Sequence, residues 1–591
     1  MRASVPARRD APYALAGASA SFMTLICCPI HVDGAGQVEE ALAKARSAVA
    51  KGAKLIEWRA DLLAEEIAEV AVPAIRTLVA ESPAPCILTI RPTWEGGLYA
   101  GSESDRVSLF EAIGTGSPAP RYFDIELDAY RTSRNRRQKL NLAVDHADQV
   151  RDVEPRLILS THDFGSRPAD LLQRVAAMAA EPACAVMKIA WTARSIRDNL
   201  EAFDLLADRV KPSVALCMGE FGLMSRVLAG KFGGLFTFAA LDRGEESAPG
   251  QPSIDELRGL YRFDRVNAAT RVYGVIGALV SHSRSPTVHN AGFSSVEFDG
   301  VYLPMPIPRE YEHFKASVGA MIDHPTLTFR GASITIPHKE HCVRFVRERG
   351  GHVGAIAAAL GAANTLIVED DGTIACANTD AAAAVEAIVG GLRRVDGRLD
   401  GVRVAILGAG GVARAVAGGV AIAGGRAVVF ARDAARAEAL ASDVMRGIGA
   451  LDANDADQAE QISALIGAKT APGNVTVGRC EALGCGCFEV FVNCTPVGMS
   501  GGPAADGDPV ESLAASVGQD VTVQYDGVLV MDTVYVPRET PWLRTARDRG
   551  ATCVYGSDMF VRQACRQFTR WTRRDAPRAT FDALAQVLSH D

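Results

Sequence analysis

Apolar runs of strand length alternate with amphipathic segments between residues 25 and 250. Eight runs fit buried strands, at residues 25–30, 53–59, 86–91, 122–127, 156–161, 185–190, 213–218 and 236–240. The segments between them, such as 38–49 and 169–180, place apolar residues at helical spacing. Eight strands interleaved with helices over this length predict a (β/α)8 barrel.

A second α/β pattern follows a polar seam at residues 256–270, which we predict to be a linker. Residues 403–407 form the continuous apolar run typical of a buried parallel strand, and a glycine-rich turn, a helix and another run at 427–430 come after it. This is the start of a βαβ unit. Residues 445–485 are polar and irregular, and we predict an insertion there.

The composition of 591 residues, with 48% hydrophobic and 22% charged, is that of a folded chain that needs no disulfide bonds for stability. The 62 basic and 70 acidic side chains give a net charge of −8. Such a chain has no net basic field to hold nucleic acid or an anionic membrane. We therefore expect small-molecule partners, with any anion held by local Arg or Lys pockets. The oligomeric state is left open, and a monomer fits the sequence.

Thirteen cysteines without regular spacing predict reduced, mostly buried thiols and a cytoplasmic protein. The densest cysteine cluster, at 480–494, lacks paired C-x-x-C spacing and a nearby His, so no metal is expected. The apolar stretch 402–430 contains Arg414 and many glycines, which argues against a membrane span. Residues 1–22 are predicted to be an N-terminal extension, with a plastid transit peptide as the alternative.

Two residues suited to covalent chemistry lie at predicted barrel strands. Lys188 stands between apolar neighbours, where burial favours a neutral, nucleophilic amine. His162 follows the preceding strand and can move protons. Because barrel enzymes place their chemistry at the carboxyl ends of the strands, the pair favours Schiff-base chemistry over a solvent-directed lysine and a turn-capping histidine.

The motifs around these two residues resemble those of type I 3-dehydroquinate dehydratases, and the resemblance covers residues 23–251. It implies that Lys188 forms an imine with the substrate ketone, that His162 is the general acid and base, and that Glu95 lies beside them. It also implies six substrate contacts: Glu57, Arg59, Arg91, Arg226, Ser247 and Gln251. The last two belong to a loop that would close over the ligand.

A glycine turn with the spacing of a nucleotide site follows the strand at 403–407. It consists of Gly408, Ala409, Gly410, Gly411, Val412 and Ala413. Because it opens a helix, its backbone can approach a pyrophosphate. After the next strand, Arg432 stands where an NAD-binding chain carries an acid, and Arg436 is a second candidate. This predicts a Rossmann fold that binds NADP(H) through its 2′-phosphate.

Hydroxyl and amide side chains gather in several motifs of this second half, and such groups suit a polyol carboxylate. Together the motifs resemble shikimate dehydrogenases over residues 271–591. The resemblance implies that Lys339 gives a proton to the carbonyl oxygen while Asp380 holds the lysine and a substrate hydroxyl. It implies substrate contacts at Ser283, Ser285, Thr335, Asn364, Tyr535 and Gln563, and further cofactor contacts at Thr495, Gly556 and Met559.

Three positions depart from the dehydrogenase pattern. Ser333 replaces the Asn of N-V-T, Ala383 replaces a Gly, and Ala431 replaces the Asn before the NADP arginine. None of these changes removes a catalytic group. The two resemblances imply a barrel at 23–255, a substrate-binding domain at 271–382, an NADP-binding Rossmann domain at 383–555, and C-terminal helices at 556–591 that pack back on the substrate domain.

The product of the first implied reaction is the substrate of the second. This continuity favours a fused enzyme for two successive steps, which resembles the bifunctional enzyme of plants and some bacteria. Two alternatives stay open: quinate as the substrate of the second half, and a metabolite-sensing regulator on the same folds. The presence of all four catalytic groups, Lys188, His162, Lys339 and Asp380, argues against a regulator.

Overall fold

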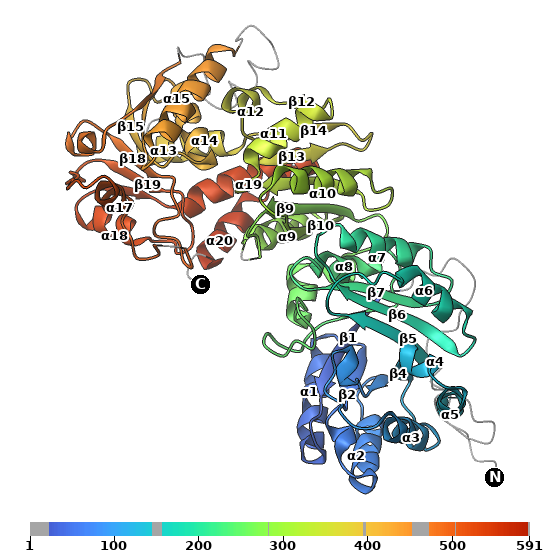
Figure 1. Cartoon of the computed structure of the whole chain (residues 1–591). Helices are drawn as coiled ribbons and strands as arrows, with labels where there is room; N and C mark the ends of the chain where they lie inside the picture. The colour runs from blue at the N-terminus through green and yellow to red at the C-terminus, as the bar shows by residue number, and fades with distance from the viewer. Residues whose placement is uncertain are drawn as a thin grey trace, which may run out of the picture.

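The computed structural model describes residues 23–144, 156–281, 283–393, 398–451, 472–502 and 504–588. The predicted extension at 1–22 and residues 452–471 of the predicted insertion lie outside these ranges. Figure 1 shows two bodies that meet at one junction, a barrel drawn from blue to green and a two-lobed body drawn from green to red.

Eight parallel strands build the barrel in the hydrogen-bonded order β7-β6-β5-β4-β3-β2-β1-β8. The strands are β1 (Leu25–His31), β2 (Leu55–Arg59), β3 (Cys86–Thr89), β4 (Tyr122–Glu126), β5 (Arg156–Asp163), β6 (Cys184–Thr192), β7 (Ser213–Met218) and β8 (Phe236–Phe238). A hydrogen bond of 2.9 Å from Leu235 N to Ser213 O joins the starts of β8 and β7. All eight predicted strands are present, so the barrel prediction is confirmed.

The barrel helices cover the outside of the strands. They are α1 (Val38–Lys51), α2 (Ala68–Ala80), α3 (Glu103–Gly114), α4 (Leu127–Arg131), α5 (Arg134–Val144), α6 (Leu171–Ala180), α7 (Asp198–Ala207) and α8 (Leu223–Val227), with short turns η1 (Ala35–Gln37), η2 (Leu63–Glu65), η3 (Thr93–Glu95) and η4 (Leu228–Gly230). Helix α1 buries Val38, Leu42 and Ala45 along one face and ends at Gly52, whose φ of 119° terminates it. The strands thus have apolar cover outside.

The first lobe of the second body is a six-stranded mixed sheet in the order β10-β9-β11-β13-β14-β12. Its strands are β9 (Arg271–Gly277), β10 (Gly300–Pro306), β11 (Phe329–Ile334), β12 (His352–Val353), β13 (Thr365–Val368) and β14 (Ile374–Ala377), and its helices are α9 (Ser285–Ser295), α10 (Tyr311–Asp323), α11 (Lys339–Glu348) and α12 (Ala355–Leu360). We call this the substrate lobe. The loop after β9 carries Ser283 and leads into α9, which begins at Ser285. The loop after β11 carries Thr335 and leads into α11, which begins at Lys339.

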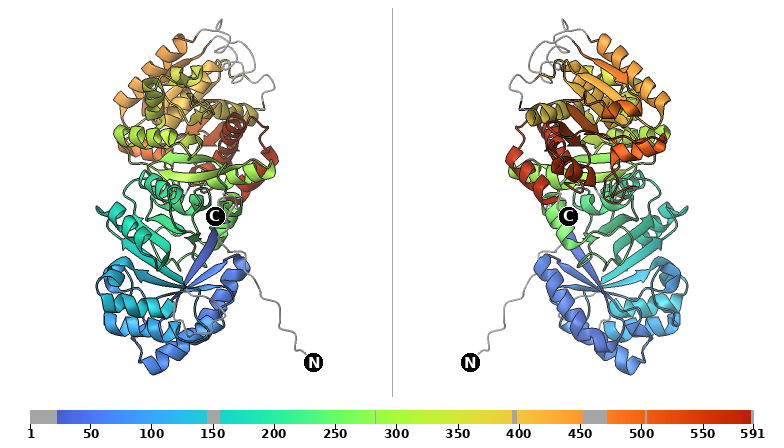
Figure 2. Two further views of the ribbon diagram at one scale, coloured as in Figure 1. Left: turned by 90° about the vertical axis from the view of Figure 1, so that its right-hand side faces the viewer. Right: turned by 90° about the vertical axis from the view of Figure 1, so that its left-hand side faces the viewer.

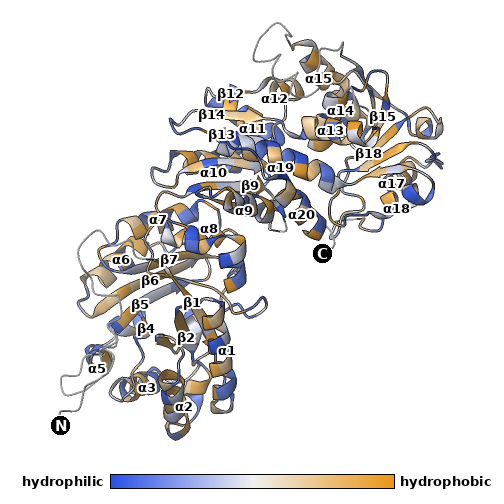
Figure 3. Ribbon diagram, turned by 180° about the vertical axis from the view of Figure 1, so that it is seen from behind, coloured by the Kyte–Doolittle hydropathy of each residue, from blue (hydrophilic) through white to orange (hydrophobic). Residues whose placement is uncertain are grey.

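The second lobe is a doubly wound parallel sheet in the order β17-β16-β15-β18-β19-β20. Its elements are α13 (Asp380–Gly391), β15 (Arg403–Leu407), α14 (Gly411–Ile422), β16 (Arg426–Phe430), α15 (Ala434–Gly449), β17 (Asn474–Val477), η7 (Cys480–Gly484), β18 (Val490–Asn493), α17 (Pro509–Ser516), β19 (Leu529–Asp532), α18 (Pro541–Asp548) and β20 (Thr552–Val554). Figure 3 shows β15 and β18 in the orange of hydrophobic residues, as expected for strands covered on both faces. This order confirms the predicted Rossmann fold.

The prediction of an insertion at 445–485 is wrong for the two ends of this range that the structure describes, because both belong to the Rossmann fold. Helix α15 continues to Gly449, and β17 is the edge strand of the Rossmann sheet. In β17 Val475 is buried while Asn474, Thr476 and Val477 are exposed. An edge strand with one buried side chain has too little apolar pattern to be recognised from the sequence.

The C-terminal helices α19 (Gly556–Thr572) and α20 (Arg578–Leu588) pack against the substrate lobe. Phe568 and Phe581 join Phe293 and Tyr273 of that lobe in one buried aromatic cluster. Figures 1 and 2 show the red helices beside the green strands and helix of the lobe. The end of the chain therefore becomes part of the lobe that begins at residue 271.

Residues 256–270, predicted to be a linker, fold against the barrel through η5 (Glu256–Leu260) and η6 (Phe263–Arg265). Leu257, Tyr261 and Phe263 are buried in the barrel core. At the junction the buried Lys231 Nζ donates to Ala268 O (2.7 Å), Thr270 O (2.9 Å) and Thr328 Oγ1 (2.8 Å). Burial lowers the pKa of Lys231 to about 8, and the three acceptors replace the hydration that it loses.

The expectation that all thirteen cysteines are unpaired is wrong for one pair, because Cys485 and Cys487 form a disulfide in the turn before β18. Two cysteines separated by one glycine lie near each other whatever their spacing from other cysteines. Eight of the other cysteines are buried thiols. Among the helices of the described ranges, none has the length and hydrophobicity needed to cross a bilayer.

Candidate active sites

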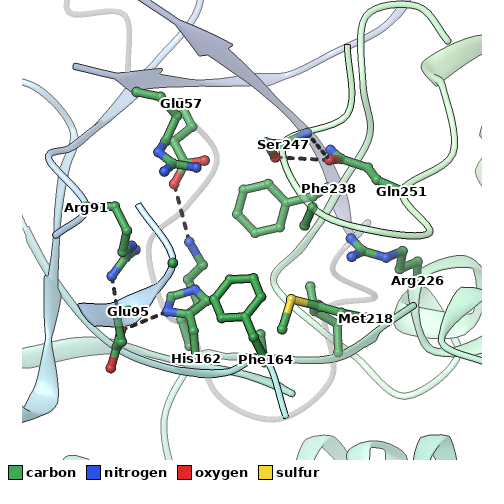
Figure 4. A pocket seen from close by; sticks show the side chains of 16 residues that line it. Glu57, Arg91, Glu95, His162, Phe164, Met218, Arg226, Phe238, Ser247 and Gln251 are labelled. Atoms are coloured by element: carbon green, nitrogen blue, oxygen red, sulfur yellow. Dashed lines mark hydrogen bonds and ion pairs between the residues drawn. The ribbon is translucent and has the colours of Figure 1, made fainter. Parts of the chain in front are cut away.

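A pocket opens at the carboxyl ends of the barrel strands (Figure 4). Its lining comprises Glu57, Arg59, Arg91, Glu95, Gly96, His162, Phe164, Lys188, Ala190, Leu216, Met218, Arg226, Phe238, Ser247, Ala248 and Gln251. These include all nine residues that the first resemblance selects. The loop that carries Ser247 and Gln251 lies on the opposite side of the pocket from Glu95 and His162 (Figure 4).

Lys188 lies in the middle of β6 and faces the barrel interior between Val186 and Ala190. Its Nζ is 2.6 Å from Asp124 Oδ2 and 3.3 Å from Glu57 Oε1, and 4.5 Å from the centre of the Phe238 ring. The sequence predicts apolar surroundings for this amine. The neighbours along the strand are apolar, but across the barrel the amine is ion-paired with two carboxylates.

His162 is held by Glu95, because its Nδ1 lies 3.0 Å from Glu95 Oε2. Burial lowers the pKa of His162 well below its ordinary value, and the positive charges of Arg91 and Lys188 lower it further. Burial also raises the pKa of Glu95 to about 8, although Arg91 opposes the rise. With Nδ1 directed at Glu95, Nε2 of a neutral imidazole is left to exchange protons with a ligand.

Two buried carboxylates of β4, Asp124 and Glu126, were not predicted from the sequence. Arg91 binds both, with Nη2 2.8 Å from Asp124 Oδ1 and Nη1 2.7 Å from Glu126 Oε1. Burial disfavours the Asp124 anion, but Arg91 and Lys188 outweigh burial and hold the Asp124 pKa well below its ordinary value. The signal was present: two acids at alternate positions of an apolar strand point to the same interior face.

Arg226 is completely buried on α8, and its guanidinium points into the pocket (Figure 4). Within the described residues neither its Nε nor its Nη2 has a hydrogen-bond partner. Burial lowers its pKa to about 10. A buried cation is stabilised by an anion, so Arg226 suits an anionic ligand group such as a carboxylate. Gln251 has a buried Nε2 without a partner in the same ranges, while its Oε1 accepts from Ser247 Oγ at 3.0 Å.

A second set of predicted residues meets at the edge of the substrate lobe. Lys339 Nζ, at the first turn of α11, lies 2.6 Å from Asp380 Oδ2 at the first turn of α13. Asn364 Nδ2 donates to Asp380 Oδ1 at 2.8 Å and contacts Gln563 Oε1 at 3.4 Å. Lys339 and Asp380 are both buried, so their charges face each other with little solvent screening.

A chain of neutral hydrogen-bonding groups reaches the backbone carbonyl of Asn364. Tyr302 Oη donates to Ser333 Oγ (2.6 Å), which donates to Gln567 Oε1 (2.7 Å). Gln567 Nε2 then donates to Asn364 O (2.9 Å) and to Thr365 Oγ1 (3.1 Å). Ser333, the replacement for the family Asn, therefore belongs to this buried chain.

The glycine turn can accommodate a dinucleotide. Gly408 has φ +115°, and a Cβ there would lie 3.1 Å from Cys494 O. No described atom lies within 4 Å of a Cβ placed on Gly410, and no described side chain caps the start of α14. These free N–H groups and the open space suit a pyrophosphate. A Cβ on Gly411 would lie 3.3 Å from Lys339 Cδ, so the turn also borders Lys339.

The structure places the remaining predicted residues of the second body in both lobes. Arg432 and Arg436 are exposed after β16 and in the first turn of α15. Ser283 and Ser285 stand at the start of α9, with Ser283 Oγ accepting from Ser285 N at 3.3 Å. The other positions are as follows: Thr335 follows β11, Thr495 follows β18, Tyr535 stacks on Phe560 at 4.9 Å, and Gly556 and Met559 lie in the first turn of α19.

Met559 is buried in the hydrophobic core between the Rossmann sheet and α13, so its contacts are mainly packing. Asn493 and Asp532, at the ends of β18 and β19, were not predicted. Asn493 Nδ2 donates to Asp532 Oδ1 at 2.9 Å, and Asn493 Oδ1 accepts from Thr495 Oγ1 at 2.7 Å. They shape the Thr495 loop. In the described ranges no group of three or more His, Cys, Asp and Glu side chains is placed to hold a metal ion.

Comparison with known proteins connects both sites to families. Residues 26–268 match the family described as type I 3-dehydroquinase, and residues 275–366 match the shikimate dehydrogenase substrate binding domain. The shikimate dehydrogenase (NADP(+)) of Methanothermobacter thermautotrophicus is 33% identical over 328 residues, which are 55% of this chain and 100% of that protein. A solved structure of dehydroquinate dehydratase and shikimate dehydrogenase from S. pombe covers 96% of this chain and 98% of its own, with 22% identity and a TM-score of 0.38.

The full-length relationship is found with the Arabidopsis thaliana protein described as bifunctional 3-dehydroquinate dehydratase/shikimate dehydrogenase, chloroplastic. The two chains are 33% identical over 570 residues, which are 94% of this chain and 83% of that protein. The match therefore includes both bodies and the junction between them. This chain belongs to the family of bifunctional 3-dehydroquinate dehydratase/shikimate dehydrogenases.

Proposed function

We propose that the barrel converts 3-dehydroquinate to 3-dehydroshikimate and that the second body reduces this product to shikimate with NADPH. The chain is a lyase and an oxidoreductase of the shikimate pathway, in accord with its family. The assignment of individual residues rests on the two clusters around Lys188 and Lys339. The observation that carries it is the contrast between the buried, ion-paired Lys188 in the barrel pocket and the Lys339–Asp380 pair beside the glycine turn.

In the barrel, the first step is attack of the Lys188 amine on the C3 ketone. The Lys188 ammonium, which Asp124 holds at 2.6 Å, gives its proton to solvent before this attack, and the adduct then loses water to give the imine. The imine makes the C2 proton acidic, and Nε2 of neutral His162 removes it. His162 returns this proton to the C1 hydroxyl as it leaves as water. Hydrolysis of the imine releases 3-dehydroshikimate and restores the amine, so the net change is loss of one water.

The arginines of the pocket orient the substrate for this sequence. Arg226, whose buried guanidinium has free donors, binds the substrate carboxylate in two hydrogen bonds. Arg59, Glu57 and Arg91 contact the ring hydroxyls from the other side, and Ser247 and Gln251 close the pocket. Each of these contacts fixes the C2–H bond relative to the imidazole of His162.

In the second body, the glycine turn and Arg432 hold NADPH, which supplies a hydride to the carbonyl carbon when bound. Lys339 gives a proton to the carbonyl oxygen, and Asp380 holds the ammonium in place at 2.6 Å. Asn364, Thr335 and Gln563 orient the hydroxyls, and Ser283 and Ser285 receive the carboxylate. Tyr535 is a further proposed substrate contact. The protein thus contributes one proton and a fixed orientation.

Quinate dehydrogenase activity and a regulatory role are not favoured, because the full-length relative unites the two shikimate-pathway activities. The partners we propose are therefore the small molecules 3-dehydroquinate, 3-dehydroshikimate, shikimate and NADP(H). The Arabidopsis relative is chloroplastic, whereas we propose a cytoplasmic location for this chain. Fluorescent tagging of the intact chain would test that location.

A coupled assay tests the function directly. Purified full-length protein is given 3-dehydroquinate and NADPH, and the loss of absorbance at the nicotinamide band is followed. We expect NADPH loss after a lag in which 3-dehydroshikimate accumulates, and no loss without 3-dehydroquinate. Rates with shikimate or quinate, each with NADP or NAD, identify the second substrate. Faster oxidation of quinate than of shikimate would contradict the proposal.

A further inference from the structure

Two fully buried charged residues of the barrel have no role in the mechanism above. Arg106 lies on α3, outside the strands, and Glu126 lies at the end of β4. Both are at most 1% exposed. A buried ion is costly unless its partners are in good geometry, so a pair of this kind needs a structural or a functional explanation.

The pair is part of a chain of alternating charges, which we call the ion chain. It runs Glu103–Arg106–Glu126–Arg91–Asp124–Lys188, with successive nitrogen-to-oxygen distances of 3.0, 2.7, 2.7, 2.8 and 2.6 Å. It starts at the partly exposed Glu103 on the outside of the barrel and ends at the nucleophile. Three cations alternate with three anions, so each interior anion has two cations.

Arg106 contacts two groups that position Arg91: the backbone that precedes it and the carboxylate that binds its side chain. Its Nη1 donates to the carbonyl of Ile90, the residue immediately before Arg91, at 2.8 Å. Its Nη2 lies 2.7 Å from Glu126 Oε2, while the other oxygen of that carboxylate binds Arg91 Nη1 at 2.7 Å. Arg106 thus fixes the backbone before Arg91 and the carboxylate that holds its side chain.

We propose that Arg106 is a positioning residue for the dehydratase: by sharing Glu126 it keeps Arg91 in contact with Asp124 and Glu95 at the catalytic centre. The inference rests on the proposed function of the barrel. Arg91 Nη1 is divided between Glu126 at 2.7 Å and Glu95 at 3.5 Å. If Arg106 is lost, Arg91 is the one cation that remains at Glu126 among the described residues, and Glu126 draws it outward.

This movement has an electrostatic consequence at His162. The charged groups that act on its imidazole are Arg91, Lys188, Asp124, Arg59 and Glu95. After burial, the positive charge of Arg91 is the strongest influence that lowers the His162 pKa. Withdrawal of Arg91 therefore raises that pKa. Because the base must be neutral to take the C2 proton, the acid limb of the dehydratase profile moves to higher pH.

The test is Arg106→Gln in the full-length protein, with Arg137→Gln as a matched control, because Arg137 is a partly exposed barrel arginine on α5 that lies outside the ion chain. We expect dehydratase kcat/KM to fall about 10–100-fold, as for a misplaced catalytic group, with the acid limb at higher pH. Arg137→Gln should leave both unchanged. Reductase turnover with 3-dehydroshikimate measures active protein in the same sample and should match wild type.

Addition of Glu126→Gln to Arg106→Gln removes the unbalanced carboxylate. We expect this double variant to return the acid limb towards its wild-type position, which a merely structural loss would not do. If Arg106→Gln does not fold, Arg106→Lys decides, with a two- to fivefold loss expected because the contact with Ile90 is lost while the charge stays.

Several results would overturn the inference. One is wild-type dehydratase kinetics and pH dependence in folded Arg106→Gln, another is an acid limb that the double variant does not restore, and a third is unchanged kcat/KM in Arg106→Lys. Wild-type protein that fails to dehydrate 3-dehydroquinate would instead contradict the proposed function.

Discussion

The two sites of this chain use charge in opposite ways. The barrel pocket is surrounded by the ion chain and by Arg226, a buried cation that lacks a carboxylate partner among the described residues. The second site has one buried ion pair, Lys339–Asp380, supported by the neutral chain through Ser333 and Gln567. In the proposed mechanism the barrel itself provides the nucleophile and the acid–base catalyst, so it must hold several charges. In the second body bound NADPH would bring the reducing electrons, and we propose that the protein supplies one proton.

The two sites should also differ in how far the effect of a substitution spreads. In a network of buried ions each group sets the environment of the others, so the loss of one charge reaches the whole pocket. In the second site most groups are neutral donors and acceptors, and each substitution should stay more local. Because both sites share one chain, each serves as the internal reference for the other in every variant.

The largest expected effect is that of Lys188→Ala. Without the amine no imine forms, so dehydratase turnover should fall by about a thousandfold or more, while reduction of 3-dehydroshikimate stays at the wild-type rate. Borohydride with 3-dehydroquinate should add the reduced adduct mass to the wild-type chain and not to the variant. Lys54→Ala, at an exposed lysine, is the control and should keep the adduct. An adduct of equal yield in Lys188→Ala would refute the imine.

The reciprocal variant, Lys339→Ala, tests whether the dehydratase works independently of the reductase. Loss of the proton donor should lower reductase kcat by about 10²–10⁴-fold and leave dehydratase kcat unchanged. Initial rates with 3-dehydroshikimate and NADPH measure the first, and formation of the conjugated product from 3-dehydroquinate measures the second. Arg344→Ala on the exposed face of the same helix is the control. A matching drop in dehydratase rate would mean that the two sites are not independent.

The smallest expected effect is on cofactor choice. Arg432→Ala removes the proposed partner of the 2′-phosphate at an exposed position, so KM for NADPH should rise about tenfold while KM for NADH changes little. Arg436→Ala should have a weaker effect, because Arg436 is the second candidate. Steady-state kinetics with both cofactors check this. An equal rise in KM for NADPH and NADH would assign Arg432 a role other than phosphate recognition.

The barrel strands were predictable because each is a short apolar run flanked by polar turns, and the turn at Gly408–Ala413 has a spacing that few other structures require. Strand β17 was not predictable, since an edge strand buries little. The packing of Leu257 and Phe263 in the barrel core was not predicted for residues 256–270, for a related reason. Short apolar contributions to a distant core do not form a periodic pattern of their own.

Single reactive residues were easier to identify than the groups that hold them. Lys188 and His162 are unusual in their local sequence, whereas Arg106 resembles any charged residue on an amphipathic helix. Its partner Glu126 is twenty positions away, and the contact between Gln567 and Asn364 spans 203 positions. Such pairs exist only through tertiary packing, which local periodicity does not encode.

The junction around Lys231 limits how such a chain can be divided or recombined. The core of the barrel is completed by residues that come after its last strand, and the next folding unit starts with Thr270 and β9, only a few positions later. A gene cut at residue 255 would deprive the barrel of Leu257, Tyr261 and Phe263. The two folding units therefore follow each other with only a few residues between them, and the boundary at which they could be exchanged as modules is confined to residues 267–270, where the Lys231 ammonium binds the carbonyls of Ala268 and Thr270.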